Sequence, residues 1–141
     1  MSALYSTRVS AVGGRSGSVR SEDGILALDL ALPNGLGGKG GKTNPEQLFA
    51  AGYAACFENA VLHVAKAQKA GIADDAVIVV AEVGIHPNGS GGFRLSVALE
   101  TSIAGIDQAS AEALVAAAHQ VCPYSNAVKG NIDVALTVKT H

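Results

Sequence analysis

The feature that most constrains this fold is one long apolar segment that begins near residue 44 and reaches about residue 70. Asn44 suits an N-cap, Pro45 suits the first helical position, and Gln47 stands where a capping-box side chain reaches back. The sequence therefore predicts a helix that runs to about Ala70, with Gly71 as its stop. Because this helix would be apolar nearly all round, we expect it to be central and buried on most sides.

Alternating leucines before the helix predict a strand. From Leu26 to Leu32 every second residue is a leucine, so four leucines share one face, and Pro33 then ends the strand. We expect residues 4–12 to form its antiparallel hairpin partner, while residues 13–23 supply turns and room for a short strand.

A second set of alternating segments follows the helix. Residues 77–85 and 93–99 predict another hairpin. Residues 107–121 predict a helix that is capped by Asp107 or a close neighbour and stopped by Pro123. Residues 132–138 alternate once more and predict a final strand. This order of elements indicates the α+β class with antiparallel sheets.

Length and charge narrow the class of protein. A chain of 141 residues is expected to form one domain, residues 1–141. Its net charge is −2, only 16% of residues are charged, and it has no basic cluster for nucleic acid or an anionic membrane. The first eight residues lack the apolar core of a signal peptide, and no uninterrupted run approaches the roughly 20 apolar residues that span a bilayer. We therefore expect a cytoplasmic protein without nucleic-acid or membrane partners.

A glycine-rich loop at residues 35–41 invites comparison with loops that bind phosphate. That interpretation fails, because no Gly-Lys-Ser/Thr follows at the required distance and no strand runs directly into the loop.

The chain has two cysteines, Cys56 within the predicted central helix and Cys122 just before Pro123. A cysteine reacts as its thiolate, and an ordinary thiol is only slightly ionised at neutral pH, so a reactive cysteine needs a cationic neighbour. Arg15, in a glycine-flanked loop, is a candidate cation, and Glu46 is a carboxylate able to orient it. The pattern favours thiol redox chemistry.

Each thiol also has ordinary alternatives. Either cysteine can be a small buried hydrophobic residue, and the two can form a structural disulfide, although a reducing compartment disfavours one. Zinc is another use for two thiols, with His63 and His119 as the further candidates, but no Cys-x-x-Cys or Cys/His ligand spacing exists. We expect no metal site.

Helix geometry limits how Glu46 can serve Cys56. Ten residues of straight helix separate them by about 15 Å at about 1.5 Å per residue, too far for one hydrogen-bonded cluster. Alone, Arg15 would be a solvated loop arginine and Glu46 an ordinary first-turn acid. If the three cooperate, either the helix breaks between them or a neighbouring subunit brings its own arginine and glutamate. We favour the second hypothesis.

Four segments carry a resemblance to a known family: Asn44–Phe57, Val121–Asn126, Gly13–Arg15 and Leu36–Gly38. In these the sequence resembles the organic hydroperoxide resistance proteins, a branch of the family shared with the osmotically inducible stress proteins. The resemblance covers essentially the whole chain. Asn-Pro-Glu-Gln-Leu-Phe and Pro-Tyr-Ser within the first two segments favour the hydroperoxide resistance branch.

The resemblance implies an intertwined α+β homodimer, with antiparallel sheets wrapped around two central helices and two active sites at the interface. It implies a peroxidase in which the Cys56 thiolate attacks the O–O bond of an organic hydroperoxide and becomes a sulfenic acid. Cys122 then resolves it to an intrasubunit disulfide. The implied reductant is dihydrolipoamide or a lipoylated protein rather than thioredoxin, with no bound cofactor.

The resemblance also gives Arg15 and Glu46 roles. Arg15 would lower the pKa of the cysteine and donate to the peroxide, while Glu46 would hold the guanidinium through a bidentate pair. Apolar side chains near the thiol, with Phe49, Tyr53 and Phe57 as our candidates, would favour bulky alkyl or fatty acid hydroperoxides.

Other functions stay open at this point. The sister branch would give a peroxidase of broader specificity, and a non-catalytic redox sensor would use the same two thiols as a switch. An inert structural dimer would show thiols of ordinary reactivity. Residues 86–92 carry no motif of the family, so their role in substrate entry is undecided.

Overall fold

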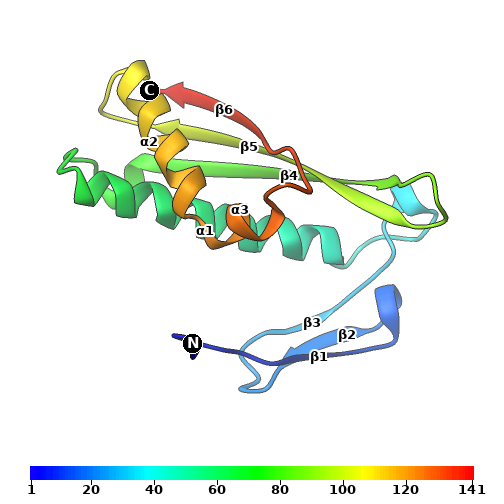
Figure 1. Ribbon diagram of the computed structural model, residues 1–141. Coiled ribbons are helices and arrows are strands. Elements are labelled where there is room, and N and C mark those ends of the chain that lie inside the picture. Colours follow the sequence, from blue (N-terminus) through cyan, green and yellow to red (C-terminus); the bar gives the residue numbers. More distant parts are fainter. The chain divides into compact units, whose positions relative to one another are not determined.

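Strands come first along the chain, followed by a long helix, a hairpin, two further helices and a last strand, as Figure 1 shows. The computed structural model describes all residues from 1 to 141, and the predicted α+β class is confirmed. The chain divides into two compact units, residues 1–48 and residues 49–141, and each unit has a sheet of its own.

The first unit contains a three-stranded antiparallel sheet of β1 (Val9–Val12), β2 (Ser18–Ser21) and β3 (Ala27–Asp29), in the order β1-β2-β3. The expectation that β1 would pair directly with the leucine-rich strand is wrong, because β2 lies between them. Strand β2 contains a single apolar residue, Val19, so its sequence carries no alternating pattern.

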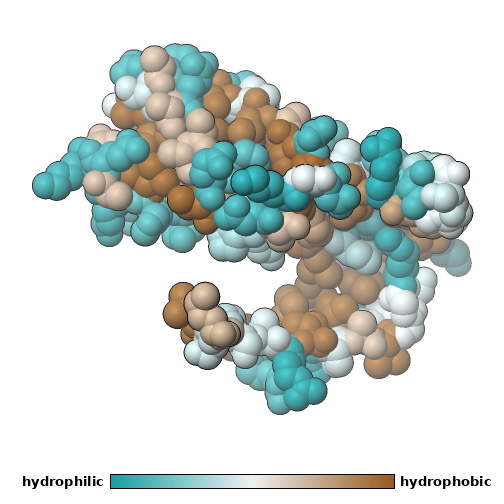
Figure 2. Space-filling model, viewed as in Figure 1, coloured by the Kyte–Doolittle hydropathy of each residue, from teal (hydrophilic) through white to brown (hydrophobic).

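The leucine-rich strand is shorter than its alternation predicts. It ends at Asp29, after which Leu30 makes an isolated parallel bridge to Thr43. Leu30 is buried at 4% exposure, whereas other apolar side chains of this unit stay exposed, among them Val9, Val12, Ile25 and Leu26. Figure 2 shows hydrophobic surface of the first unit in brown. This small sheet therefore leaves much of its apolar surface uncovered within one chain.

Helix α1 (Pro45–Ala67) begins at the predicted residue. Asn44 Oδ1 accepts the backbone N–H of Gln47 at 2.9 Å, which confirms the N-cap. The Gln47 side chain instead accepts from the Thr43 hydroxyl at 2.8 Å. The helix ends three residues before the predicted limit, and Gly71, at a φ of 70°, follows that end.

By length and mean hydropathy α1 is able to span a membrane. The sequence analysis did not identify it as such, because it considered only uninterrupted runs of apolar residues. A core helix of a soluble protein passes the same test. The buried side chains of α1 lie in the core of the second unit, and they are Tyr53, Phe57, Ala60, Val61, Val64 and Ala65. This helix is therefore weak support for a membrane protein.

The second unit has a three-stranded sheet. Strands β4 (Val77–Pro87) and β5 (Phe93–Ile103) form the predicted hairpin, and β6 (Ala135–Thr140) pairs in parallel with β5. One face of the sheet is buried against the helices through Val97, Leu99 and neighbouring alternate residues. The opposite face exposes Ile78 and Val80, so the sheet is covered on one side only.

Helix α2 (Gln108–Val121) begins after Asp107, whose carboxylate accepts the backbone N–H of Ser110 at 2.9 Å. The chain turns at Cys122 and continues as a short helix, α3 (Pro123–Val128), which the sequence analysis did not anticipate. Pro123 stops α2 as expected, but it also occupies the first position of α3, where a missing N–H costs nothing. Cys122 is thereby held between two helices.

Candidate functional site

Arg15 and Glu46 form a bidentate ion pair in the first unit. Arg15 Nη1 donates to Glu46 Oε2 at 2.7 Å, and Nη2 donates to Oε1 at 2.6 Å. The glutamate side chain is 14% exposed and the arginine side chain 36%. The hydrogen bonds from Arg15 hold the pKa of Glu46 below its ordinary value, and the same contacts raise the pKa of Arg15. The structure thus presents a fixed guanidinium.

The loop that carries Arg15 is a tight turn built by glycines. Gly13 and Gly14 have φ values of 83° and 61°, in the left-handed region that glycine adopts readily. A Cβ on Gly17 would run into the backbone carbonyl of Val12. These glycines allow the chain to reverse closely around the arginine.

The two cysteines come together in the second unit. Cys56 lies on α1 and is half-buried, whereas Cys122 is fully buried at the start of α3, and both are free thiols. Burial raises the pKa of Cys56, and the charge and hydrogen bonding of Cys122 raise it further. The backbone N–H of Tyr124 lowers it to a smaller extent. The second unit therefore supplies a thiol pair whose surroundings favour the protonated form of Cys56.

The three aromatic candidates form one stripe along α1. Phe49, Tyr53 and Phe57 are spaced four residues apart, and the ring centroids of successive members lie 6.3 Å apart. The Tyr124 ring packs against the first two, at 6.3 and 5.6 Å. Tyr53 and Phe57 have no exposed surface. Phe49 is partly buried, which leaves it the most accessible of the three.

Phe49 lines a cavity of about 730 Å³ together with residues of the β4–β5 hairpin and of the segment after α3. Phe93 and Asn88 contribute from the hairpin, and Val128 and Ile132 from the other side. The Asn88 carboxamide oxygen accepts backbone N–H groups at residues 90 and 92, which fixes the hairpin connection. Asn88, in the segment without a family motif, is thus part of the lining of this cavity.

Two polar side chains that the sequence analysis did not connect with the thiols lie beside Tyr53. The Tyr53 hydroxyl is 2.7 Å from Ser125 Oγ, and His119 Nδ1 is 2.8 Å from the same oxygen. Ser125 belongs to a segment that carries the family resemblance, but nothing local in the sequence pairs it with a residue on α1.

Helix α1 is continuous from Pro45 to Ala67, so the hypothesis of a helix break between Glu46 and Cys56 is wrong. The alternative, a contribution from a neighbouring subunit, stays a hypothesis.

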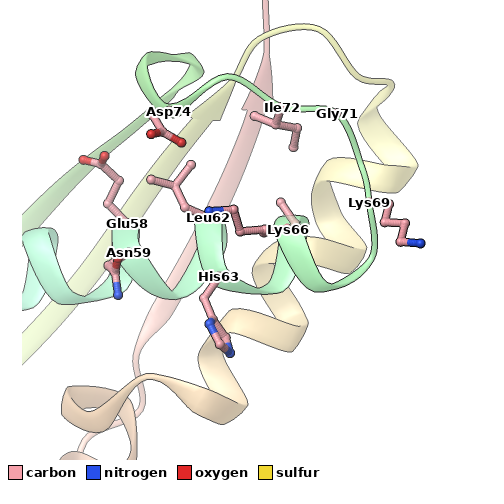
Figure 3. Close-up of a pocket in the computed structure, with 10 residues that line it drawn as sticks. Glu58, Asn59, Leu62, His63, Lys66, Lys69, Gly71, Ile72 and Asp74 are labelled. Atoms are coloured by element: carbon pink, nitrogen blue, oxygen red, sulfur yellow. The ribbon is translucent and has the colours of Figure 1, made fainter.

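His63, considered above as a zinc ligand, lies beside a cavity of about 570 Å³ along the second half of α1. Figure 3 shows Glu58 and Leu62 on the side of the helix that faces Asp74, whereas His63 points to the opposite side. No group of three or more histidine, cysteine, aspartate or glutamate side chains is placed to hold a metal ion. Nothing in this geometry supports the zinc alternative.

Comparison with known proteins gives a family. The model of the family described as OsmC-like protein matches residues 38–137. An organic hydroperoxide resistance protein of Xanthomonas axonopodis pv. citri is 49% identical over 136 residues, which cover 96% of this chain and 94% of the relative. The organic hydroperoxide resistance protein OhrB of Bacillus subtilis is 45% identical, over 97% and 99% of the two chains.

A solved structure agrees. The crystal structure of an organic hydroperoxide resistance protein OsmC from Legionella pneumophila superposes with a TM-score of 0.94 at 56% identity, covering 98% of this chain and 99% of that chain. The α+β fold that the sequence resemblance implied for the chain is therefore confirmed, although β6 pairs in parallel rather than antiparallel. The chain belongs to the OsmC-like family, in its branch of organic hydroperoxide resistance proteins.

Proposed function

We propose that this protein is a thiol peroxidase that reduces organic hydroperoxides to alcohols through Cys56 and Cys122. The observation that carries the proposal is the meeting of these two cysteines, 66 positions apart in sequence, at the junction of α1 and α3 in a member of this family. Its relatives are named for resistance to organic hydroperoxides.

The raised pKa of Cys56 supports a contribution from a second subunit. Burial and Cys122 raise the pKa of Cys56, so this thiol needs a cation to react at neutral pH. Arg15 is held by Glu46 in a geometry that leaves the guanidinium a fixed cation. We assign this role to Arg15 of the partner subunit in a homodimer.

Uncovered apolar surface supports a homodimer. The sheet of the second unit exposes Ile78 and Val80 on its outer face, and the sheet of the first unit exposes Val9 and Leu28. Apolar surface of this kind is typical of an interaction site. A second copy of the chain would cover these faces and bring Arg15 and Glu46 to the thiols.

In the proposed cycle the Cys56 thiolate attacks one peroxide oxygen, the O–O bond breaks, and the alkoxide leaves as an alcohol after taking up a proton. Cys56 is then a sulfenic acid. The Cys122 thiol condenses with it to form a disulfide and water. A dithiol, which we propose to be dihydrolipoamide or a lipoylated protein, reduces this disulfide and returns both cysteines.

The proposed substrate class draws on the aromatic side chains of α1 and on the names of the relatives. Phe49, backed by the buried rings of Tyr53 and Phe57, presents an apolar side chain to a cavity of a size suited to an alkyl chain. We propose alkyl or fatty acid hydroperoxides as substrates. Two free thiols persist most readily in a reducing compartment, so we place this chemistry in the cytoplasm.

The test is steady-state consumption of cumene hydroperoxide with dihydrolipoamide as the reductant, with thioredoxin as the comparison reductant. Cys56→Ser should abolish turnover, and Cys122→Ser should allow one oxidation of Cys56 without forming the intrasubunit disulfide. Equal turnover of hydrogen peroxide would favour the broader sister branch. One oxidation per thiol pair, without turnover under either reductant, would favour a redox sensor and contradict the proposal.

A further inference from the structure

A chain of hydrogen bonds runs from the core of the second unit to a cavity beside α3. The Tyr53 hydroxyl lies 2.7 Å from Ser125 Oγ, which lies 2.8 Å from His119 Nδ1. Tyr53 and Ser125 are 0% and 3% exposed, whereas His119 is half-buried. The hydrogen-bond chain therefore leads from the buried hydroxyl of Tyr53 to the imidazole of His119, which has access to the surface.

The buried end of this chain lies one helical turn from both thiols. Tyr53 precedes Cys56 by three residues on α1, and Ser125 follows Cys122 by three residues on α3. Side chains with this spacing are neighbours on a helix. Burial raises the pKa of Tyr53, and the charges of Cys122 and Cys56 raise it further, which is consistent with a hydroxyl within electrostatic reach of both thiols.

The outer end of the chain opens on a polar cavity of about 270 Å³ that both His119 and Ser125 line. At about 30 Å³ for each water molecule, this volume accommodates several waters. The other polar side chains that line it are all exposed, so water has access to the imidazole; they are Gln120, Asn126, Lys129 and Asp133.

The Ser125 hydroxyl has one hydrogen, so it donates to one neighbour and accepts from the other. The chain can therefore run from Tyr53 through Ser125 to a neutral His119, or from a protonated His119 through Ser125 to Tyr53. One proton shift along each hydrogen bond converts one direction into the other. An imidazole is suited to the outer position because one ring nitrogen can accept a proton while the other donates one.

The peroxidase cycle takes up one proton and releases one proton. The departing alkoxide takes up one proton when Cys56 becomes a sulfenic acid. Condensation with the Cys122 thiol releases water and leaves no net proton. Reduction by a dithiol then regenerates the Cys56 thiolate and the Cys122 thiol, and releases one proton. Because Cys122 has no exposed surface, that thiol has no direct contact with bulk water through which to exchange a proton.

We propose that Tyr53, Ser125 and His119 form a proton relay that connects the thiol pair with the cavity beside His119. The relay presupposes the peroxidase cycle proposed above and assigns the path of its one proton. The three residues act through proton transfer and positioning, since no contact joins them to the peroxide.

The decisive variant is His119→Ala, assayed with cumene hydroperoxide and dihydrolipoamide. Loss of proton transfer should lower turnover about tenfold or more, since general acid–base groups commonly contribute about 10²-fold or more. Added imidazole should restore turnover, because it fits the space vacated beside a solvent-filled cavity. Pyrazole has nearly the same shape but is a far weaker base, so it should fill the space without restoring turnover.

Two further variants separate the relay from a structural role. His119→Asn keeps a polar group beside Ser125 but cannot take up a proton, and Tyr53→Phe removes the inner hydroxyl. Both should lower turnover while thermal unfolding and stoichiometric labelling of Cys56 show a folded protein. Gln120→Ala, which changes the same cavity without touching the hydrogen-bond chain, is the matched control and should keep full turnover.

Restoration by imidazole and not by pyrazole would support the relay. The relay would be overturned if imidazole and pyrazole restored turnover equally, or if neither restored it in a folded His119→Ala protein. Full turnover in His119→Asn and Tyr53→Phe would also overturn it. Wild-type turnover separately tests the proposed function. Its absence counts against the peroxidase itself, whereas an active wild type with unaffected variants counts against the relay alone.

Discussion

The Arg15 guanidinium holds both carboxylate oxygens of Glu46, at 2.7 and 2.6 Å, so that the loop and the first turn of α1 are fastened through one planar contact. A bidentate pair fixes the direction of the guanidinium as well as its distance. The orientation of the remaining N–H donors of Arg15 is thereby fixed.

We expect Glu46→Gln to slow the reaction of Cys56 with an alkyl hydroperoxide about tenfold or more, because a neutral amide loses a charge-assisted contact that is commonly equivalent to about 1.5 to 3 kcal/mol. The measurement is stopped-flow oxidation of Cys56 in the absence of reductant. Glu22→Gln, an exposed acid of the same unit, is the control and should react at the wild-type rate. An unchanged rate in Glu46→Gln would remove this residue from the mechanism.

Acid should weaken the contribution of the same pair to stability. The folded pKa of Glu46 lies below its ordinary value of 4.5, chiefly because of the hydrogen bonds from Arg15. The ion pair therefore contributes its full stabilisation of the folded state at pH values above the ordinary pKa of Glu46. This contribution is lost as the pH falls from the ordinary pKa through the lower pKa of the folded state. Urea unfolding of wild type and Glu46→Gln should show a difference at neutral pH that disappears on acidification. A difference independent of pH would contradict this assignment.

Gly52 allows the Tyr124 ring to lie against α1, since a Cβ at position 52 would approach its Cζ to 3.0 Å and its Cε2 to 3.2 Å and would meet the hydroxyl still more closely. In an exposed helix Gly→Ala stabilises by about 1 kcal/mol. Here we expect Gly52→Ala to destabilise by about 1 to 3 kcal/mol through overpacking. In a Tyr124→Ala background the same change should become stabilising. A double-mutant cycle by chemical denaturation measures this reversal.

Thr101 Oγ1 is buried on the core face of β5 without a hydrogen-bond partner. Thr101→Val replaces this hydroxyl by a methyl group of the same shape, so we expect a gain of up to about 1 kcal/mol in the free energy of unfolding. Thr101→Ser keeps the hydroxyl and loses the methyl group, and it should destabilise. A loss of stability in Thr101→Val, measured by denaturant unfolding, would reveal a partner for the hydroxyl in the assembled protein.

Sequence patterns predicted the elements whose information is local. The N-caps at Asn44 and Asp107 and the alternation in β4 and β5 each depend on residues a few positions apart, and these elements begin near their predicted residues. The bounds and the pairing of strand β2 were not predicted, because it has a single apolar side chain, Val19, and its position depends on pairing with both neighbours.

The candidate site shows a different limit. Tyr53 and Ser125 are 72 residues apart in sequence, and their contact depends on how α3 turns back after Pro123. No periodicity records such a contact. Arg15 and Glu46 were candidates from residue chemistry, but their bidentate pairing was implied only by the family resemblance, because a loop arginine and a first-turn acid are each ordinary when read locally.

The parallel pairing of β6 with β5 has a consequence for biosynthesis. A ribosome releases Ala135–Thr140 only after the hairpin and all three helices, and these residues complete one edge of the sheet. Until then the outer edge of β5 has unpaired backbone groups, while α2 lacks the Val138 carbonyl that the Gln108 carboxamide binds at 2.9 Å. The second unit therefore completes its sheet only after β6 has emerged, and until then the exposed edge of β5 is a template on which another chain can pair.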